Sequence, residues 1–183
     1  MADFRPARTP AEEKQFDERV VHIDRVARVV KGGRRFRFRA LVVVGDPKTH
    51  KVGVGSAKGA DVTSAVAKAV DVAKKNIITV PVYKNTLPHE ITAKVSGAHI
   101  LIKPASEGTG LIAGGVIRTI LEVCGLHNVL SKSLGSTNKT NIAYATVEGL
   151  KSLVPASNWL TMQNAKKTTR KPKAKVVAKE SKP

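Results

Sequence analysis

Residues 104–125 read Pro-Ala-Ser-Glu-Gly-Thr-Gly-Leu-Ile-Ala-Gly-Gly-Val-Ile-Arg-Thr-Ile-Leu-Glu-Val-Cys-Gly. A short apolar run at 98–103 precedes them and predicts a strand, so the region is interpreted as strand, glycine-rich turn and helix. The apolar residues of the predicted helix recur at the spacing of one helical face, and they are Val116, Ile117, Ile120, Leu121 and Cys124. Gly125 is expected to end the helix, because glycine adopts the positive φ that a common C-terminal cap requires.

Residues 83–160 are expected to form one α+β unit around this region. Further strands are predicted near 90–95 and 128–133, where short apolar runs lie between turn residues. A last helix is predicted to begin near Asn138, run to Val154 and stop at Pro155. The expected inner face of this helix consists of Ala143, Thr146, Val147, Leu150 and Val154. The order strand-strand-helix-strand-helix indicates a sheet with helices on one side.

Residues 19–82 are expected to form another α+β unit, made of three strands and a helix. Strands at 19–31 and 34–44 flank Gly32-Gly33, which is a strong turn signal. Along the second of them, apolar residues alternate with arginines, which predicts one buried face containing Phe36 and Phe38. A strand at 51–55 and a helix at 61–76 follow, and this helix is expected to cover the phenylalanine face.

The sequence therefore predicts an α+β fold of two small domains between two less ordered ends. Residues 1–18 contain two prolines and mixed charge without a period, and they are expected to be a flexible extension. Residues 161–183 are rich in Lys, Thr and Pro, and they are expected to be a basic tail that is disordered until bound.

The net charge of +18 points to a polyanionic partner. The last 18 residues hold eight Lys or Arg and one Glu, while the preceding 165 hold 24 basic and 13 acidic residues. A basic folded body of this kind is typical of proteins that contact nucleic-acid phosphates. A membrane surface is the competing polyanion, but no amphipathic stretch combines these charges with exposed aromatic and leucine side chains.

The remaining composition favours a cytoplasmic location. No apolar run approaches the length of a membrane span, and the first 24 residues lack the apolar segment of a secretory signal. The single cysteine, Cys124, cannot form a disulfide within the chain and is expected on a buried helical face, where its thiol would be inert.

Two glycine clusters resemble phosphate-binding loops without matching one. The cluster at 108–115 is followed by Val116-Ile117 where a Walker motif requires Lys-Ser/Thr, so nucleotide binding is disfavoured against a tight turn that permits close helix–sheet or protein–protein approach. The cluster at 53–59 places Lys58 in a predicted loop beside a helix N-terminus. There Lys58 has two equally weighted interpretations, a phosphate contact and a solvated surface residue.

The strongest binding signal is the segment from Arg25 to Arg39, which contains seven basic residues and no acidic one. Arginines that alternate along a strand beside a Gly-Gly turn present positive charge as a flat array that fits phosphates, and the glycines let a backbone approach closely. Catalysis has little support, because the five histidines show no metal-ligand spacing and no nucleophile-base set is evident.

Five segments carry a family resemblance when they are taken in order. They are Val-Lys-Gly-Gly-Arg-Arg-Phe-Arg-Phe at 30–38, Val-Val-Gly-Asp at 43–46, Lys-Val-Gly-Val-Gly at 51–55, the glycine-rich segment 104–115, and Ser-Leu-Gly-Ser-Thr-Asn at 133–138. Together they resemble the family of protein five of the bacterial small ribosomal subunit. The resemblance implies a domain like a double-stranded-RNA-binding domain, then a domain like one in elongation factor G. It implies no enzyme activity, no cofactor and no metal.

The resemblance also implies partners and site residues. The expected partners are small-subunit rRNA and ribosomal proteins four and eight, with mRNA nearby in the channel through which it enters, and a role in decoding accuracy follows. The 31–35 loop would reach rRNA near the spectinomycin site. The expected RNA-binding residues are Arg25, Arg28, Lys31, Gly32, Gly33, Arg34, Arg35, Arg37, Lys58, Ser136 and Asn138. The expected contacts with protein four are Glu107, Gly108, Thr109, Gly110 and Arg118.

The sequence departs from the family pattern in four places, and two rival functions remain. Only Lys58 matches the family between Ser56 and Gly59, Thr63 and Lys139 replace prolines, and a lysine-rich tail replaces the usual C-terminal segment. The rivals are a free-standing RNA-binding protein or RNA chaperone, and a nucleotide-dependent enzyme that uses the glycine-rich loop.

Overall fold

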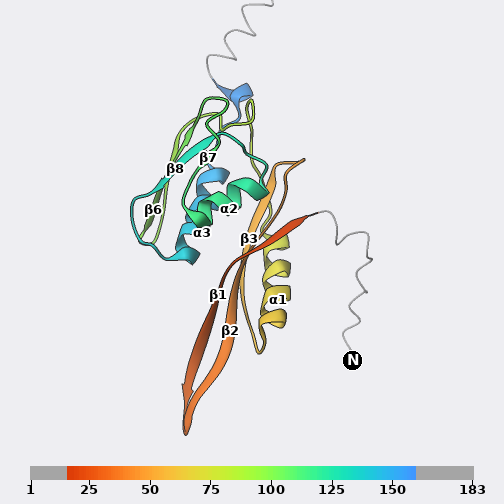
Figure 1. The fold of residues 1–183 in the computed structure, drawn as a ribbon, viewed down its shortest axis with the longest axis vertical. Helices are drawn as coiled ribbons and strands as arrows, with labels where there is room; N and C mark the ends of the chain where they lie inside the picture. Colours follow the sequence, from red (N-terminus) through yellow and green to blue (C-terminus); the bar gives the residue numbers. More distant parts are fainter. Residues whose placement is uncertain (1–15, 160–183) are drawn as a thin grey trace, which may run out of the picture.

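The computed structural model describes residues 16–159, which form two four-stranded sheets and three α-helices (Figure 1). The predicted tail and most of the predicted N-terminal extension lie outside the described residues. The elements of the first half are β1 (Asp17–Val30), β2 (Gly33–Asp46), β3 (Lys51–Gly59), α1 (Val62–Lys75) and β4 (Ile78–Thr79). Those of the second half are β5 (Ile91–Val95), β6 (Ala98–Pro104), β7 (Leu111–Ile112), α2 (Gly115–Val123), β8 (Val129–Ser133), α3 (Lys139–Lys151) and a 3-10 turn (Ala156–Asn158).

The first sheet has the strand order β1-β2-β3-β4, all antiparallel, and α1 covers one of its faces. The predicted alternation of β2 is confirmed at its inner end, where Ala40, Val42 and Val44 pack against the buried side of α1. Toward the tip of the hairpin, the predicted burial is wrong. Phe36 lies beyond the part of β2 that pairs with β3 and is 49% exposed. The two-residue strand β4 was not predicted.

Glycines on β3 let α1 lie close to the sheet. A side-chain carbon added at Gly53 or Gly55 would collide with the backbone of α1 at Ala73 or Ala69. The facing side of α1 is correspondingly small and buried, with Ala65, Ala69 and Ala73. The family-like glycines of β3 therefore serve helix packing.

The second sheet has the order β5-β6-β8-β7, in which only the β7–β8 pair is parallel. Helices α2 and α3 lie on the same side of it (Figure 1). The short strand β7 forms inside the glycine-rich segment, where the sequence predicted only a turn. Helix α3 ends at Lys151, three residues before the predicted end, and Val154 is 45% exposed, so its predicted place on the inner face is wrong.

The end of α2 confirms the predicted glycine cap. Gly125 has φ 77°, its N–H donates to the carbonyl of Glu122, and the N–H of Leu126 donates to the carbonyl of Leu121. This is the hydrogen-bond pattern of a Schellman cap. Gly125 also lies against Pro47 of the β2–β3 turn, where a side chain would have no room.

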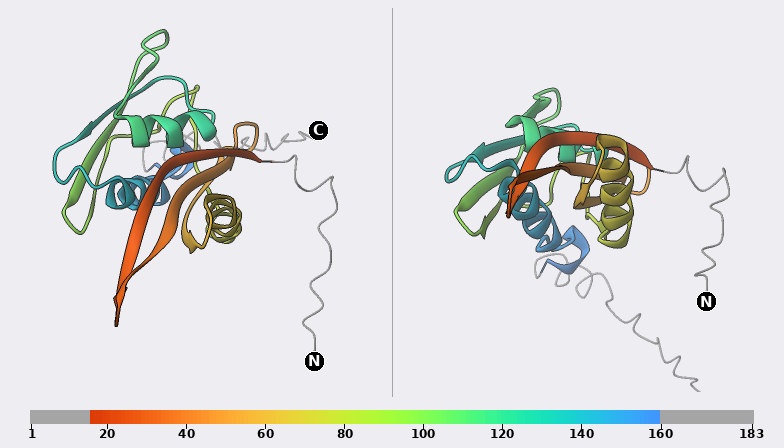
Figure 2. Two further views of the ribbon diagram at one scale, coloured as in Figure 1. Left: turned by 60° about the horizontal axis from the view of Figure 1, so that its bottom comes forward. Right: turned by 90° about the horizontal axis from the view of Figure 1, so that it is seen from below.

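The two sheets share one apolar core, with α2 and α3 between them (Figure 2). Leu41 and Val43 point away from α1 and join a buried cluster with Ile120, Val123 and Leu150. The sequence predicted only one buried face for β2. Instead the middle of this strand is buried on both faces, because the helices of the second half cover the other one.

Candidate nucleic-acid interface

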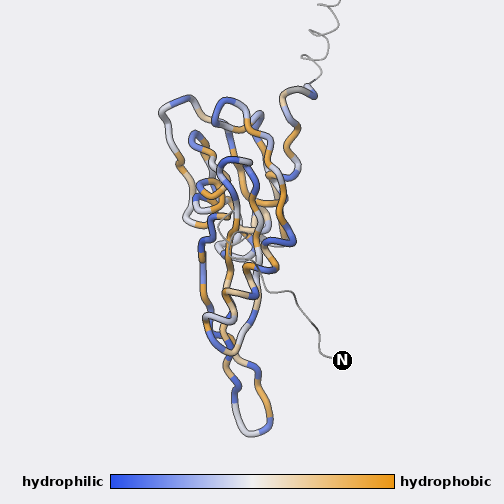
Figure 3. The backbone as a smooth tube through the Cα atoms, turned by 90° about the vertical axis from the view of Figure 1, so that its right-hand side faces the viewer, coloured by the Kyte–Doolittle hydropathy of each residue, from blue (hydrophilic) through white to orange (hydrophobic). Residues whose placement is uncertain are grey.

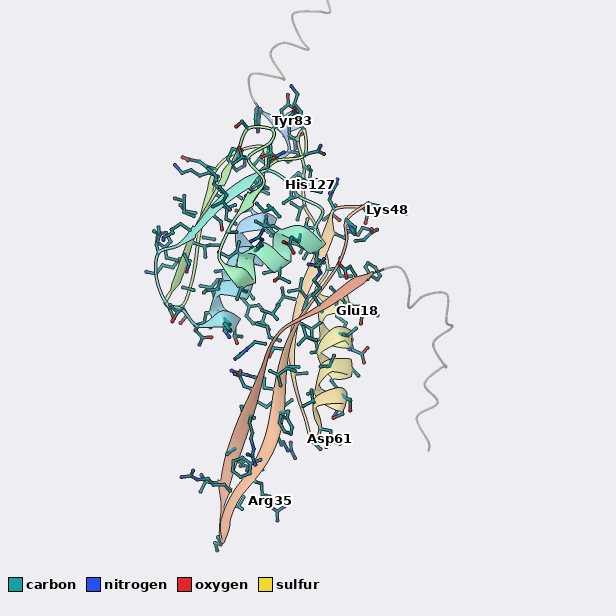
Figure 4. The ribbon with its side chains drawn as sticks, viewed as in Figure 1. Glu18, Arg35, Lys48, Asp61, Tyr83 and His127 are labelled. Atoms are coloured by element: carbon teal, nitrogen blue, oxygen red, sulfur yellow. The ribbon has the colours of Figure 1, made fainter. Side chains whose placement is uncertain are left out.

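The outer half of the β1–β2 hairpin projects beyond α1 and away from the second sheet (Figures 1 and 2). The strands stay paired without a break from His22 opposite Leu41 to Val30 opposite Gly33. Hydrophilic and hydrophobic segments alternate along this projection (Figure 3), and Arg35 lies near its tip (Figure 4).

The turn of the hairpin depends on backbone conformation. Gly32 and Gly33 have φ values of 89° and 147°, which other residues rarely adopt. A side-chain carbon at either position would meet no atom of the chain within 4 Å. The turn therefore requires glycine for its φ angles, and the space beside both glycines and Lys31 is open.

Register and alternation sort the predicted arginines onto two faces. Arg28 is paired opposite Arg35, and Arg37 follows two residues along on the same face. Like charges directly opposite each other destabilise an antiparallel pair, unless an anion lies between them. Within residues 16–159, no carboxylate forms an ion pair with any of these three arginines. We call Arg28, Arg35 and Arg37 the arginine face.

Lys58 extends the arginine face toward the sheet. The prediction placed Lys58 in a loop, but it lies on β3, exposed and opposite Arg39. The strand continues to Gly59 because it keeps pairing with β2 as far as Phe38, which local turn signals did not reveal. Paired residues point to the same face of the sheet, and Arg39 is on the same face as Arg37 two residues before it. Lys58 therefore lies on the same face as Arg37.

Arg39 itself is not a free cation, in contrast to the predicted seven-residue array. Its guanidinium donates to Asp24 at 2.6 and 3.1 Å, and this hydrogen bonding holds the pKa of Asp24 below its usual value. His22 Nε2 lies 2.7 Å from Asp24, and Lys139 Nζ lies 3.1 Å from His22 Nδ1. This series of contacts links the base of the hairpin to the start of α3. Its members are distant in the sequence, so only the folded structure reveals the link.

The opposite face of the hairpin combines arginine with apolar residues. Arg25 stacks over the ring of Phe36, with its guanidinium carbon 3.8 Å from the ring centre. Arg34 lies on the same face, opposite Val29. The predicted RNA-binding arginines therefore do not form one array.

Ser136 and Asn138 lie in the loop before α3, away from the hairpin tip, and both are used in local structure. Asn138 caps α3 by accepting from the N–H of Thr140 at 3.1 Å. Ser136 accepts from the N–H of Asn138 at 3.2 Å, and its own N–H donates to Gly97. These bonds use the two side-chain oxygens as acceptors, and they leave the Asn138 amide nitrogen and the Ser136 hydroxyl hydrogen as possible donors to RNA.

The predicted protein-contact loop is an exposed turn with its own hydrogen bonds. Gly108 and Gly110 have φ values of 89° and 73°, and the N–H of Gly110 donates to Asn128 at 3.2 Å. A side-chain carbon at either glycine would meet nothing of this chain within 4 Å. Close approach of helix and sheet therefore does not explain these glycines and their positive φ does, while close approach of another protein stays a prediction. Glu107 and Thr109 are exposed.

Arg118 does not join that loop through an ion pair. It pairs with Glu122 one turn along α2 at 3.1 Å, and Glu122 also accepts from Arg19 of β1 at 2.7 Å. Arg118 is thus part of a link between α2 and the first sheet. The pair with Glu122 was not predicted, although its i,i+4 spacing is a local signal; no local signal indicates Arg19.

The described residues gather no catalytic set. Among residues 16–159 no three His, Cys, Asp or Glu side chains are grouped as metal ligands, and no helix is long and apolar enough to cross a membrane. Burial raises the pKa of the Cys124 thiol to about 12. The start of α2 borders a hollow of about 470 Å³ with a mixed lining, in which apolar residues such as Val20, Val116 and Ile142 lie beside Thr119, Ser133, Thr137 and Lys139.

Two protein-family comparisons cover most of the chain. The sequence model of the N-terminal domain of ribosomal protein S5 matches residues 16–81. The sequence model of the C-terminal domain of ribosomal protein S5 matches residues 93–163. The two matches occur in the family's order, and together they include the hairpin, the glycine-rich segment and both sheets.

Proposed function

The chain belongs to the ribosomal protein S5 family, whose members are small-subunit proteins that bind rRNA, and we propose that it binds rRNA through the β1–β2 hairpin. The single observation that carries this proposal is the arginine face. Arg28 and Arg35 face each other without a carboxylate partner in the described part of the chain, an arrangement that phosphates would stabilise. Lys31 and Lys58 would extend the same contact from the tip to the sheet.

The test is the salt dependence of binding to a small-subunit rRNA transcript. Replacing Arg28, Arg35 and Arg37 together with Ala should reduce the slope of log affinity against log salt by about three, because each lost phosphate contact removes about one. The matched control replaces Lys94, Lys103 and Lys132 with Ala, which removes the same charge from the exposed side of the second sheet. Equal slopes for the two triple variants would refute a specific role of the hairpin.

We further propose that the exposed turn at Glu107–Gly110 contacts ribosomal protein four and supports decoding accuracy there. Its support is the family resemblance of the 104–115 segment together with its position, since the turn is closed by its own hydrogen bonds and leaves its glycines uncovered. Because Cys124 is buried, a cysteine placed at Thr109 would be the only accessible thiol among the described residues. A cross-linker there should attach to protein four in assembled subunits. Attachment only to rRNA would contradict the proposal.

Protein eight as a second neighbour, a position beside the channel through which mRNA enters, and a cytoplasmic location in the ribosome belong to the same proposal. The alternative is a free-standing RNA-binding protein or RNA chaperone. Sedimentation of a cell extract separates the two. The protein should migrate with the small subunit, and a distribution mainly outside that fraction would favour the alternative.

A further inference from the structure

We propose that the second face of the hairpin, which bears Arg25, Val29 and Phe36, binds an unpaired nucleobase of RNA by stacking. We call these three residues the stacking face. This inference rests on the proposed function, because it assigns a second kind of RNA contact to the same hairpin. It assigns the arginine face to phosphates and the stacking face to a base.

The first observation is apolar surface where no part of the described chain covers it. Val29 is 77% exposed and Phe36 is 49% exposed. Pairing places both on one face, since Ala27 is opposite Phe36 and Val29 is opposite Arg34. Strand β3 ends opposite Phe38, so neither it nor α1 reaches this far along the hairpin.

The second observation is the contact between the Arg25 guanidinium group and the Phe36 ring. The Arg25 guanidinium carbon lies 3.8 Å from the centre of the Phe36 ring, which is the geometry of a cation–π contact. Arg25 remains exposed in this contact. Arginine planes and aromatic rings are the side chains on which unpaired RNA bases stack. The contact with Phe36 holds the Arg25 plane in place before RNA arrives, which lowers the entropy cost of stacking.

The chemistry of this face selects a base over the other candidates. A phosphate would gain nothing from exposed valine and phenylalanine, so charge alone does not explain the surface. An apolar surface of a partner protein would fit Val29 and Phe36 but would leave the surrounding cations without counter-charges. Residues 25–37 contain six basic residues and no acidic one. A base with its own flanking phosphates satisfies both the apolar and the charged groups. It must be unpaired, because bases within a duplex already have both faces stacked.

Binding of the full-length chain to a small-subunit rRNA transcript tests the stacking face. The Phe36→Ala variant should lose about tenfold in affinity, the scale of one lost base stack, while its salt slope stays that of the unmodified chain. Phe36→Trp should restore the affinity. Because Phe36 is half exposed, neither change should alter the far-UV circular dichroism. Unchanged affinity of Phe36→Ala, or a loss accompanied by a smaller salt slope, would overturn the proposal.

A fluorescence measurement reads the contact directly. The chain has one tryptophan, Trp159, which lies beside Tyr83 in the second half. A Trp159→Phe, Phe36→Trp protein would carry its only tryptophan on the stacking face, and a stacked base should quench its emission on RNA binding. Bound RNA without quenching would show that this face meets protein or solvent instead.

The outcomes separate this inference from the proposed function. If the arginine-face variant loses salt dependence while Phe36→Ala binds like the unmodified chain, the hairpin binds phosphates and only the stacking inference fails. If neither variant changes binding, the proposed function of the hairpin fails as well.

Discussion

Among single residues, Gly32 shows most clearly how one side chain decides the shape of the binding element. Its φ of 89° costs a residue with a side chain about 1–2 kcal/mol, while the space around it is empty. Replacing Gly32 with Ala should therefore lower the free energy of unfolding by about 1 kcal/mol through backbone strain alone. Urea denaturation measures the change.

Gly115 provides the control for Gly32, because it is the first residue of α2, has no positive φ and has equally open surroundings. Gly115→Ala should leave stability within about 0.5 kcal/mol or raise it slightly, since alanine favours a helix and restricts the unfolded chain. If the two variants lost equal stability, conformation at the hairpin tip would not be the cause.

Asp24 gives the hairpin base a pH dependence whose sign follows from its lowered pKa. The hydrogen bond from Arg39 favours the carboxylate in the folded state. Its stabilisation is therefore present above the ordinary aspartate pKa of 3.8, and it is lost as the pH falls through the lower folded value. Asp24→Asn should reduce the unfolding free energy at pH 7 by about 0.5–1 kcal/mol, as for other partly exposed ion pairs.

The difference between Asp24→Asn and the unmodified chain should shrink at pH 3, because below pH 3.8 the carboxyl group takes up a proton more readily in the unfolded chain than in the folded one. Urea denaturation at pH 7, 5 and 3 measures it. Glu107→Gln is the control, since the exposed Glu107 forms no ion pair within the described residues and its removal should have little effect at any of these pH values. An equal loss for Asp24→Asn at pH 7 and pH 3 would contradict the assignment.

At the scale of elements, the contact between α1 and β3 is the tightest in the fold and the least tolerant of added volume. A side-chain carbon at Gly55 would overlap the backbone of α1 at Ala69 and Ala73, which cannot rotate away as a side chain would. Gly55→Ala should lower the unfolding free energy by about 2–3 kcal/mol because the whole helix must shift. Thermal or urea unfolding checks the prediction.

Gly97 is the matched position for this substitution. A side-chain carbon there would lie 3.5 Å from Ser136, an ordinary contact distance, and no unusual φ is present. Gly97→Ala should therefore cost less than about 0.5 kcal/mol. A mild Gly55→Ala would mean that α1 is free to move on the sheet.

Elements whose signals are local were predictable from the sequence. The Gly32-Gly33 turn, the extent of α1 and the Gly125 cap follow from residues within a few positions of one another. Elements that depend on distant partners were not: β4 and β7 have two residues each and form only because β3 and β8 lie beside them. The end of β3 at Gly59, and with it the place of Lys58, has the same origin.

The same distinction between local and long-range signals holds for the candidate site. The basic segment was predicted from the sequence, because a run of basic residues can be recognised without knowing which strands pair. The sequence did not reveal that Arg39 is neutralised by Asp24 across the hairpin, or that Phe36 lies outside the buried face. Both depend on how far neighbouring strands extend. Alternation already placed Phe36 on the face opposite Arg35 and Arg37. Strand pairing adds Arg28 to the arginine face and Arg25 and Val29 to the stacking face.

For the whole molecule, the shared core ties the base of the hairpin to both halves. Leu41 and Val43 of β2 are buried against α2 and α3, and Arg19 and His50 bond across the same boundary to Glu122 and the carbonyl of Cys124.

This shared core predicts that the two halves unfold together. Leu41→Ala should lower the unfolding free energy by about 2–5 kcal/mol, as for other buried leucines. Hydrogen exchange should show the same decrease for the amides of Ile100 and Ile102 in the second sheet as for those of Val52 and Val54 in the first. Leu130→Ala, on the outer side of the second sheet and 36% exposed, is the control and should cost less. If Leu41→Ala weakened protection only in the first sheet, the halves would be independent domains.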